Sequence, residues 1–153
     1  MTVIKKLNDL DIVLSKLSRK KILSLVPTMG SLHKGHISLI NSALKYSDEV
    51  WVSIFVNPTQ FNDINDYKKY PVNSKEDINI IKSIDQNINI FIPSIDDIYG
   101  KKIIRDKFNF DGIDKILEGI KRPGHFDGVA TIVKKLFEIF NPNFVFFGEK
   151  DFQ

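Results

Sequence analysis

The sequence predicts an α/β fold, a Rossmann-like, doubly wound parallel sheet with helices on both faces. Four apolar runs, at 22–26, 50–56, 88–92 and 144–147, lack the alternation of half-exposed strands and predict strands that are buried on both faces. Segments with apolar residues at helical spacing separate these runs, and the first two runs enclose a helix in a βαβ unit. The length of 153 residues suits a single domain that spans 1–153.

Helices are expected between and around the strands. Leucines at helical spacing predict a helix at 7–17, and a second helix follows the first strand and runs to about residue 46. Ser74 is expected to cap a helix that ends near residue 84. The remaining predicted helices lie at 95–99, 113–120 and about 126–140, whereas 57–73 and most of 94–112 are expected to be loop and irregular structure.

Composition narrows the classes of function. The net charge is +3, but the lysines form no dense basic block, so an anionic small molecule is a better expected partner than nucleic acid. The absence of cysteine excludes disulfides, thiol nucleophiles and zinc–thiolate sites. No apolar run reaches the roughly 20 residues of a membrane helix, and no signal-peptide pattern opens the chain. We therefore expect no membrane partner and a cytoplasmic location.

The segment 25–40 is the strongest candidate for a binding site. An apolar strand breaks at Pro27, passes through Gly30, and restarts as a helix that carries His33 and His36 near its first turn. Backbone N–H groups and the positive end of the helix dipole then face a bound anion. The two histidines are three residues apart, so they share one helix face and can contact the same phosphate chain. Either histidine alone would more often be a cap or a surface residue.

Three further polar segments follow a strand or open a helix. Asn57 and Gln60 can hydrogen-bond a hydroxyl and a carboxylate, with a plain Asn-Pro turn as the alternative. Arg122 and His125 precede the long helix, where they suit an anion or form a structural N-terminal loop. The stretch 148–153 carries charges that suit phosphate and ribose, or forms a charged surface turn. Ligands of doubly wound sheets bind at the carboxyl ends of strands, so we expect these segments to converge there.

Glu76 and Asp77 form a pair of adjacent carboxylates. Oxygen ligands of this kind can hold magnesium together with phosphates. Acidic residues also commonly begin a helix, where they interact favourably with its dipole. Taken alone, the position of this pair favours the second interpretation.

The polar segments at the strand ends, and their order along the chain, resemble those of the pantoate–β-alanine ligase family of the nucleotidyltransferase superfamily. The matching runs are Val-Pro-Thr-Met-Gly at 26–30 with His-x-Gly-His at 33–36, Phe-Val-Asn-Pro-x-Gln-Phe at 55–61, Arg-Pro-Gly-His-Phe at 122–126 and Gly-Glu-Lys-Asp at 148–151. The resemblance covers the whole chain. It implies a nucleotidyltransferase domain that binds ATP and pantoate.

The resemblance implies ATP-dependent ligation of pantoate and β-alanine to pantothenate. In the family's reaction the pantoate carboxylate attacks the α-phosphorus of ATP, which yields pantoyl adenylate and pyrophosphate. The amine of β-alanine then displaces AMP. Magnesium and a homodimer are also implied.

The resemblance assigns roles to residues of this chain. Catalysis would depend on His33, His36 and Lys150, with His36 donating to phosphate rather than transferring a proton. The ATP-binding residues would be Met29, Gly30, Ser31, Leu32, His33, Lys34, Gly35, His36, Gly148, Glu149, Lys150 and Asp151. The residues for pantoate and β-alanine would be Thr28, Met29, Asn57, Gln60, Arg122 and His125, and the magnesium ligands Glu76 and Asp77.

The chain departs from the family pattern at two positions and at its end. Val72 and Asp127 stand where many members have arginine, and Asp127 puts negative charge near a site for anions. We expect these changes to tune the site rather than abolish it. The family continues beyond residue 153 with a smaller C-terminal domain, so we expect a fragment, a truncated product or a degraded remnant. Another small-molecule adenylyltransferase and an inactive nucleotide-binding module are the alternatives.

Overall fold

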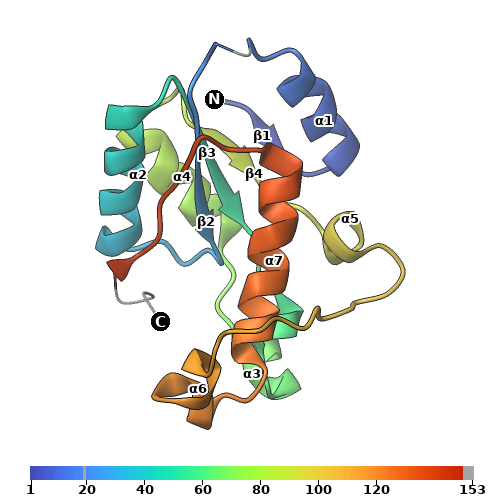
Figure 1. Ribbon diagram of the computed structural model, residues 1–153. Coiled ribbons are helices and arrows are strands. Elements are labelled where there is room, and N and C mark those ends of the chain that lie inside the picture. Colours follow the sequence, from blue (N-terminus) through green and yellow to red (C-terminus); the bar gives the residue numbers. More distant parts are fainter. Residues whose placement is uncertain (19, 150–153) are drawn as a thin grey trace.

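The computed structural model describes residues 1–18 and 20–149, which form a five-stranded parallel sheet with the order β1-β4-β3-β2-β5 (Figure 1). The strands are β1 (Val3–Ile4), β2 (Leu23–Thr28), β3 (Glu49–Ile54), β4 (Asn89–Phe91) and β5 (Phe144–Val145). From β2 the chain adds β3 and β4 on one side and later places β5 on the other. The strand order therefore reverses at β2, and doubly wound sheets bind ligands beyond the carboxyl end of such a strand.

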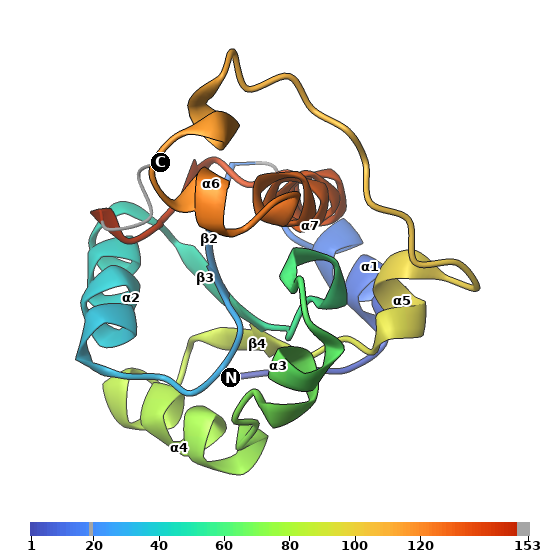
Figure 2. The same ribbon diagram turned by 90° about the horizontal axis from the view of Figure 1, so that it is seen from below.

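Helices cover both faces of the sheet, as predicted. Figure 2 shows α2 (Lys34–Tyr46) and α4 (Ser74–Ile84) on one face, and α1 (Leu7–Ser15), α5 (Ile95–Tyr99) and α7 (His125–Phe140) on the other. The short helices α3 (Ile64–Lys69) and α6 (Glu118–Lys121) lie beyond the carboxyl ends of the strands (Figure 1). Two 3-10 turns, Pro58–Gln60 and Ile113–Lys115, complete the described elements.

Adjacent residues of each central strand enter different cores. Leu25, Trp51 and Phe91 pack with residues of α1 and α7, whereas their neighbours Val26, Val52 and Ile90 pack with residues of α2 and α4. Both sides of these strands are therefore covered by apolar side chains. This arrangement accounts for apolar runs that do not alternate with polar residues.

The structure differs from the sequence-based expectations at four elements. β1 lies outside the expected strands, because a two-residue strand carries no readable pattern. α3 occupies a stretch that was expected to be loop, and Asp63 caps it by accepting the N–H of Asn65. The helix expected at 113–120 is divided into a 3-10 turn and α6. Asn73 rather than Ser74 caps α4, since its side-chain oxygen accepts the N–H of Glu76.

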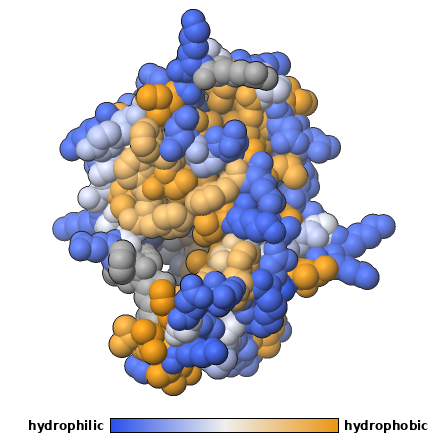
Figure 3. All heavy atoms as spheres, viewed as in Figure 1, coloured by the Kyte–Doolittle hydropathy of each residue, from blue (hydrophilic) through white to orange (hydrophobic). Residues whose placement is uncertain are grey.

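β5 forms one edge of the sheet, and the surface beside it is apolar. Phe137, Phe144 and Phe147 are all exposed, and Figure 3 shows apolar side chains gathered between α2 and α7. Within residues 1–18 and 20–149, no helix is both long and apolar enough to cross a membrane.

Candidate active site

The turn after β2 leads directly into the histidine helix. The hydroxyl of Thr28 donates to the carbonyl of Ser53 at 2.8 Å and accepts the N–H of Gly30 at 3.2 Å, which ties the end of β2 to β3. Gly30 and Ser31 then adopt left-handed backbone conformations, with φ of 84° and 52°. Glycine takes such a conformation without the steric penalty of a Cβ atom. The turn therefore brings the chain from the sheet to the start of α2.

His33 and His36 form a reciprocal capping box at the start of α2. The Nδ1 of His33 accepts the N–H of Gly35 at 3.1 Å, and the Nδ1 of His36 accepts the N–H of His33 at 3.3 Å. An Nδ1 that accepts a hydrogen bond carries no proton, so the proton of each neutral ring is on Nε2. The ring centroids are 4.1 Å apart. The cap and the expected phosphate contact are therefore compatible, because they use different nitrogens of each ring.

Most backbone amides of this loop are already used within the protein. The N–H groups of Gly30, Ser31, Leu32, His33 and Gly35 donate, in turn, to Thr28, Asp77, Asp77, His36 and His33. The expectation that the amides of this turn face an anion is wrong for these groups. Side chains at the start of α2 can supply donors instead, and His33 and Lys34 are both exposed.

Asp77 does not fit the expected magnesium site, whereas the role of the exposed Glu76 stays a prediction. Both carboxylate oxygens of Asp77 accept main-chain N–H groups, from Ser31 at 3.1 Å and from Leu32 at 2.8 Å, and the residue is 2% exposed. The carboxylate of Glu76 instead accepts the side-chain amide of Asn73 at 2.7 Å. In the part of the chain that the structure describes, no group of three or more His, Asp or Glu could hold a metal ion.

Asn57 is buried and forms several hydrogen bonds, one of which orients Gln60. Its amide nitrogen donates to the Oε1 of Gln60 at 3.1 Å and to the carbonyl of Gly128 at 3.0 Å. Its oxygen accepts the hydroxyls of Thr59 at 3.0 Å and Tyr99 at 2.5 Å. Since Asn57 is only 1% exposed, its contacts favour orienting Gln60 over binding a substrate directly. Gln60, with its oxygen engaged, presents Nε2 as a donor.

Three of the expected segments are in direct contact. The Nε2 of Gln60 donates to the sulfur of Met29 at 2.9 Å, and the Nδ1 of His125 donates to the carbonyl of Gln60 at 2.8 Å. Met29 follows β2, Gln60 follows β3 and His125 begins α7, so the contacts join three elements at the carboxyl end of the sheet. Arg122 is exposed, and its carbonyl accepts the N–H of His125 at 3.0 Å.

Tyr99 and Arg105 belong to this region, although no local sequence signal marks them. Burial raises the pKa of the Tyr99 phenol despite its hydrogen bond with Thr59, so the hydroxyl remains a donor. The Arg105 guanidinium lies against Gly124, where a Cβ atom would stand 2.3 Å from Nη1. Only the packing of the 94–112 segment against α7 reveals this contact.

The charge of Asp127 is paired within the protein. Burial alone raises the pKa of Asp127, but hydrogen bonds from the Lys107 ammonium at 2.9 Å and the Phe108 N–H at 3.0 Å, with the nearby Arg105 charge, outweigh burial and hold that pKa below its usual value. The carboxylate therefore anchors the 94–112 segment to α7. The negative charge expected near the anion site is neutralised by Lys107.

The last expected segment is described only as far as residue 149. β5 pairs with β2, so Gly148 and Glu149 follow a strand that lies next to the Met29 turn. Glu149 is exposed and Gly148 is half-buried. Lys150 and Asp151 lie outside the described residues, and their roles stay predictions.

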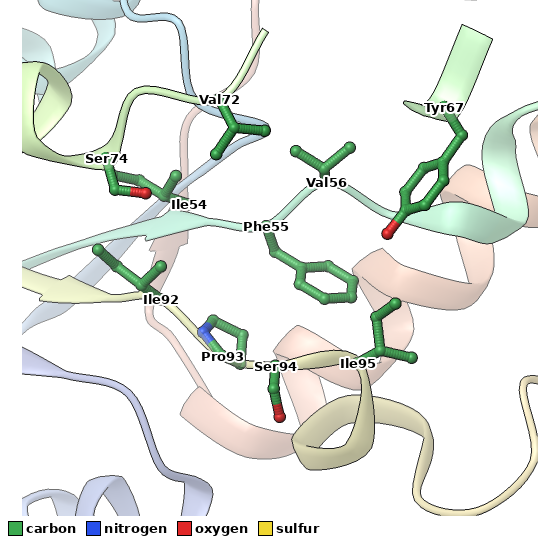
Figure 4. Close-up of a pocket in the computed structure, with 10 residues that line it drawn as sticks. All are labelled: Ile54, Phe55, Val56, Tyr67, Val72, Ser74, Ile92, Pro93, Ser94 and Ile95. Atoms are coloured by element: carbon green, nitrogen blue, oxygen red, sulfur yellow. The ribbon is translucent and has the colours of Figure 1, made fainter. Parts of the chain in front are cut away.

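An apolar cavity of about 240 Å³ lies at the ends of β3 and β4 (Figure 4). It is lined by Ile54, Phe55, Val56, Tyr67, Val72, Ser74, Ile92, Pro93, Ser94 and Ile95. None of these is an expected site residue, although Val72 is one of the two positions that depart from the family pattern. The cavity offers only three hydroxyls as polar side-chain groups, so we place the candidate active site at the contacts among Met29, Gln60 and His125.

Comparison with known proteins shows which family the chain resembles. The family model described as Pantoate-beta-alanine ligase matches residues 2–153. The pantothenate synthetase of Flavobacterium psychrophilum is 49% identical over 154 residues, covering 100% of this chain and 55% of that protein. The pantothenate synthetase of Christiangramia forsetii is 52% identical over 133 residues, covering 87% of this chain and 47% of that protein.

The solved structures that resemble this chain are also pantoate-beta-alanine ligases or pantothenate synthetases. A pantoate-beta-alanine ligase from Francisella tularensis, complexed with beta-gamma ATP and beta-alanine, superposes with a TM-score of 0.89 at 44% identity, covering 95% of this chain and 55% of that one. The pantothenate synthetase of Thermus thermophilus has a TM-score of 0.88 at 34% identity, covering 99% and 53% of the two chains. The chain spans about half the length of the relatives that it matches. The family model, the relatives and the solved structures agree, and the chain belongs to the pantoate-beta-alanine ligase family.

Proposed function

We propose that this chain takes part in the ATP-dependent ligation of pantoate and β-alanine to pantothenate. The observation that carries the proposal is the contact of Gln60 with both Met29 and His125, beside the paired histidines of α2. The related ligase from Francisella tularensis, complexed with beta-gamma ATP and beta-alanine, supports it. In the first step a pantoate carboxylate oxygen bonds to the α-phosphorus of ATP and pyrophosphate leaves. In the second, the β-alanine nitrogen bonds to the acyl carbon and AMP leaves.

In this proposal the histidine pair binds the phosphates of ATP. The Nε2–H groups of His33 and His36 donate to phosphate oxygens, and the positive end of α2 and the exposed Lys34 add favourable charge. Donors that are already oriented before the reaction stabilise developing charge by a few kcal/mol each. A donating Nε2–H also favours phosphate stabilisation by His36 over transfer of its proton.

Gln60 and His125 hold pantoate in the same proposal. The Nε2 of Gln60 now faces the sulfur of Met29, which is a weak acceptor that a carboxylate or hydroxyl can displace. The wall beside it is formed by Thr28 and Met29. Lys150 and Asp151 complete the proposed ATP site.

Three further parts of the proposal rest on the family resemblance. Magnesium would accompany the phosphates of ATP, with Glu76 as the remaining proposed ligand because Asp77 is engaged with main-chain N–H groups. A homodimer and a cytoplasmic location are likewise proposed.

Formation of AMP by the purified 153-residue chain tests the proposal. The chain is given ATP, magnesium and pantoate, with and without β-alanine, and we expect AMP release that requires both pantoate and β-alanine. His33→Gln and His36→Gln should each lower the rate by about 100-fold or more, because each removes an oriented donor. Ser38→Ala, an exposed change on the same helix, is the control.

Two results would point to the alternatives. Transfer of the adenylate onto a phosphorylated acceptor would indicate another adenylyltransferase. Binding of ATP without AMP release would indicate a nucleotide-binding module without ligase activity.

A further inference from the structure

We propose that Asp77 is a positioning residue, which holds the turn that leads into the two histidines, and that it is not a ligand of a divalent cation. This inference depends on the proposed function in one respect, namely that ATP is the nucleotide bound beside the turn. The side-chain contacts of Asp77 themselves carry the structural part.

The carboxylate of Asp77 joins α4 to the turn by two hydrogen bonds. Its Oδ2 accepts the N–H of Ser31 at 3.1 Å and its Oδ1 accepts the N–H of Leu32 at 2.8 Å. Each oxygen thus serves one of two successive amides, and the partners are about 45 residues apart in the sequence. The hydroxyl of Ser31 adds a third contact with this part of the chain, since it donates to the carbonyl of Pro71 at 2.9 Å.

Successive N–H groups near left-handed residues form concavities that bind anions. Here the turn contains Gly30 and Ser31 in left-handed conformations, and its anion is the protein's own carboxylate. Asp77 therefore occupies the place that a phosphate would take in an open loop of this kind. The phosphates of a nucleotide are left to the side chains that follow.

Gly30 gives independent support for this tight contact. A Cβ atom at position 30 would stand 2.8 Å from the Oδ2 of Asp77 and 3.2 Å from a methyl carbon of Ile54. The carboxylate therefore lies against the backbone of the turn, with no room for a side chain at position 30.

The contact determines the direction of the histidine pair. Leu32 is buried in the core under α2 and α4, and its amide is held by Asp77 immediately before His33. His33 caps α2 and exchanges hydrogen bonds with the first turn. By holding the two peptide groups before His33, Asp77 positions the start of α2 and therefore both imidazole rings. The Nε2 atoms of these rings are the proposed phosphate donors.

Amide exchange and ligand titration on the full 153-residue chain test this role. In the wild type, hydrogen exchange measured by NMR should be slow at the amides of Ser31 and Leu32. Asp77→Asn replaces one acceptor by a donor and should speed exchange at these amides by about tenfold or more, and weaken ATP binding, measured by calorimetry, by a similar factor. Asp66→Asn, the same change at an exposed residue of α3, should alter neither.

Manganese(II) provides a test that needs no variant. Added to the wild-type chain without nucleotide, a paramagnetic ion bound by Asp77 would broaden the amide signals of Ser31, Leu32 and Asp77 selectively, and we expect no such broadening. Selective broadening, fast exchange in the wild type, or normal ATP binding by Asp77→Asn would each overturn the proposal. Failure of the wild type to bind ATP would instead count against the proposed function, because the exchange and manganese results do not depend on it.

Discussion

Gly128 allows α7 to lie directly against the turn that carries Asn57 and Gln60, and Gly128→Ala tests that packing. A Cβ atom at this position would stand 2.2 Å from the carbonyl oxygen of Thr59 and 2.7 Å from the Cα of Gln60. Both are backbone atoms, so no flexible side chain can move aside. The Gly128 carbonyl also accepts a hydrogen bond from the side-chain amide of Asn57 at 3.0 Å.

A stabilising and two destabilising effects together determine how much Gly128→Ala changes the free energy of unfolding. Replacing a helical glycine by alanine ordinarily stabilises a protein by about 1 kcal/mol. Here the added methyl forces the turn and the helix apart, and overpacking of this kind costs about 1–3 kcal/mol. The hydrogen bond from Asn57 to the Gly128 carbonyl contributes about 1 kcal/mol and would be weakened or lost. We therefore expect a net loss of about 1–3 kcal/mol in the free energy of unfolding.

Urea and thermal unfolding, followed by circular dichroism, measure this loss. For a domain of this length the expected change corresponds to a Tm lower by about 2–12 °C. Gly112→Ala is the control, because Gly112 has a left-handed φ of 91° and open space around its missing Cβ, so only backbone strain of about 1–2 kcal/mol applies. A Gly128→Ala protein as stable as the wild type, or more stable, would show that helix propensity outweighs the contact and would refute the reasoning.

Two smaller predictions concern the polar contacts around the site. Tyr99→Phe removes the hydroxyl that donates to Asn57 and should lower the free energy of unfolding in urea by about 1 kcal/mol, whereas an unchanged value would show that this bond adds nothing. Because the pKa of Asp127 is held below its ordinary value of 3.8, its pairing with Lys107 contributes stability above that pH, which is lost as the pH falls through the lower folded-state pKa. The stability gap between wild type and Asp127→Asn should therefore shrink on acidification below about pH 4, and a constant gap would contradict this sign.

The sequence by itself determined the fold class and the place of the candidate site. Apolar runs without alternation predict strands buried on both faces, and the structure confirms a parallel sheet in which Leu25 and Val26 enter opposite cores. Strand and helix ends are local features, set by prolines, glycines and capping residues within a few positions. The turn at 27–33 and the start of α7 could therefore be located without tertiary structure.

Only the tertiary structure decided which partners the polar residues take. Asp77 carries the same carboxylate whether it binds magnesium, begins a helix or holds the amides of Ser31 and Leu32, and only the packing of α4 beside the turn selects the last. Tyr99 reaches Asn57 across 42 positions of sequence, which no local pattern can indicate. The physical reason is that hydrogen-bond partners far apart in the chain are set by sheet register and helix packing. Local propensity and spacing carry no information about either.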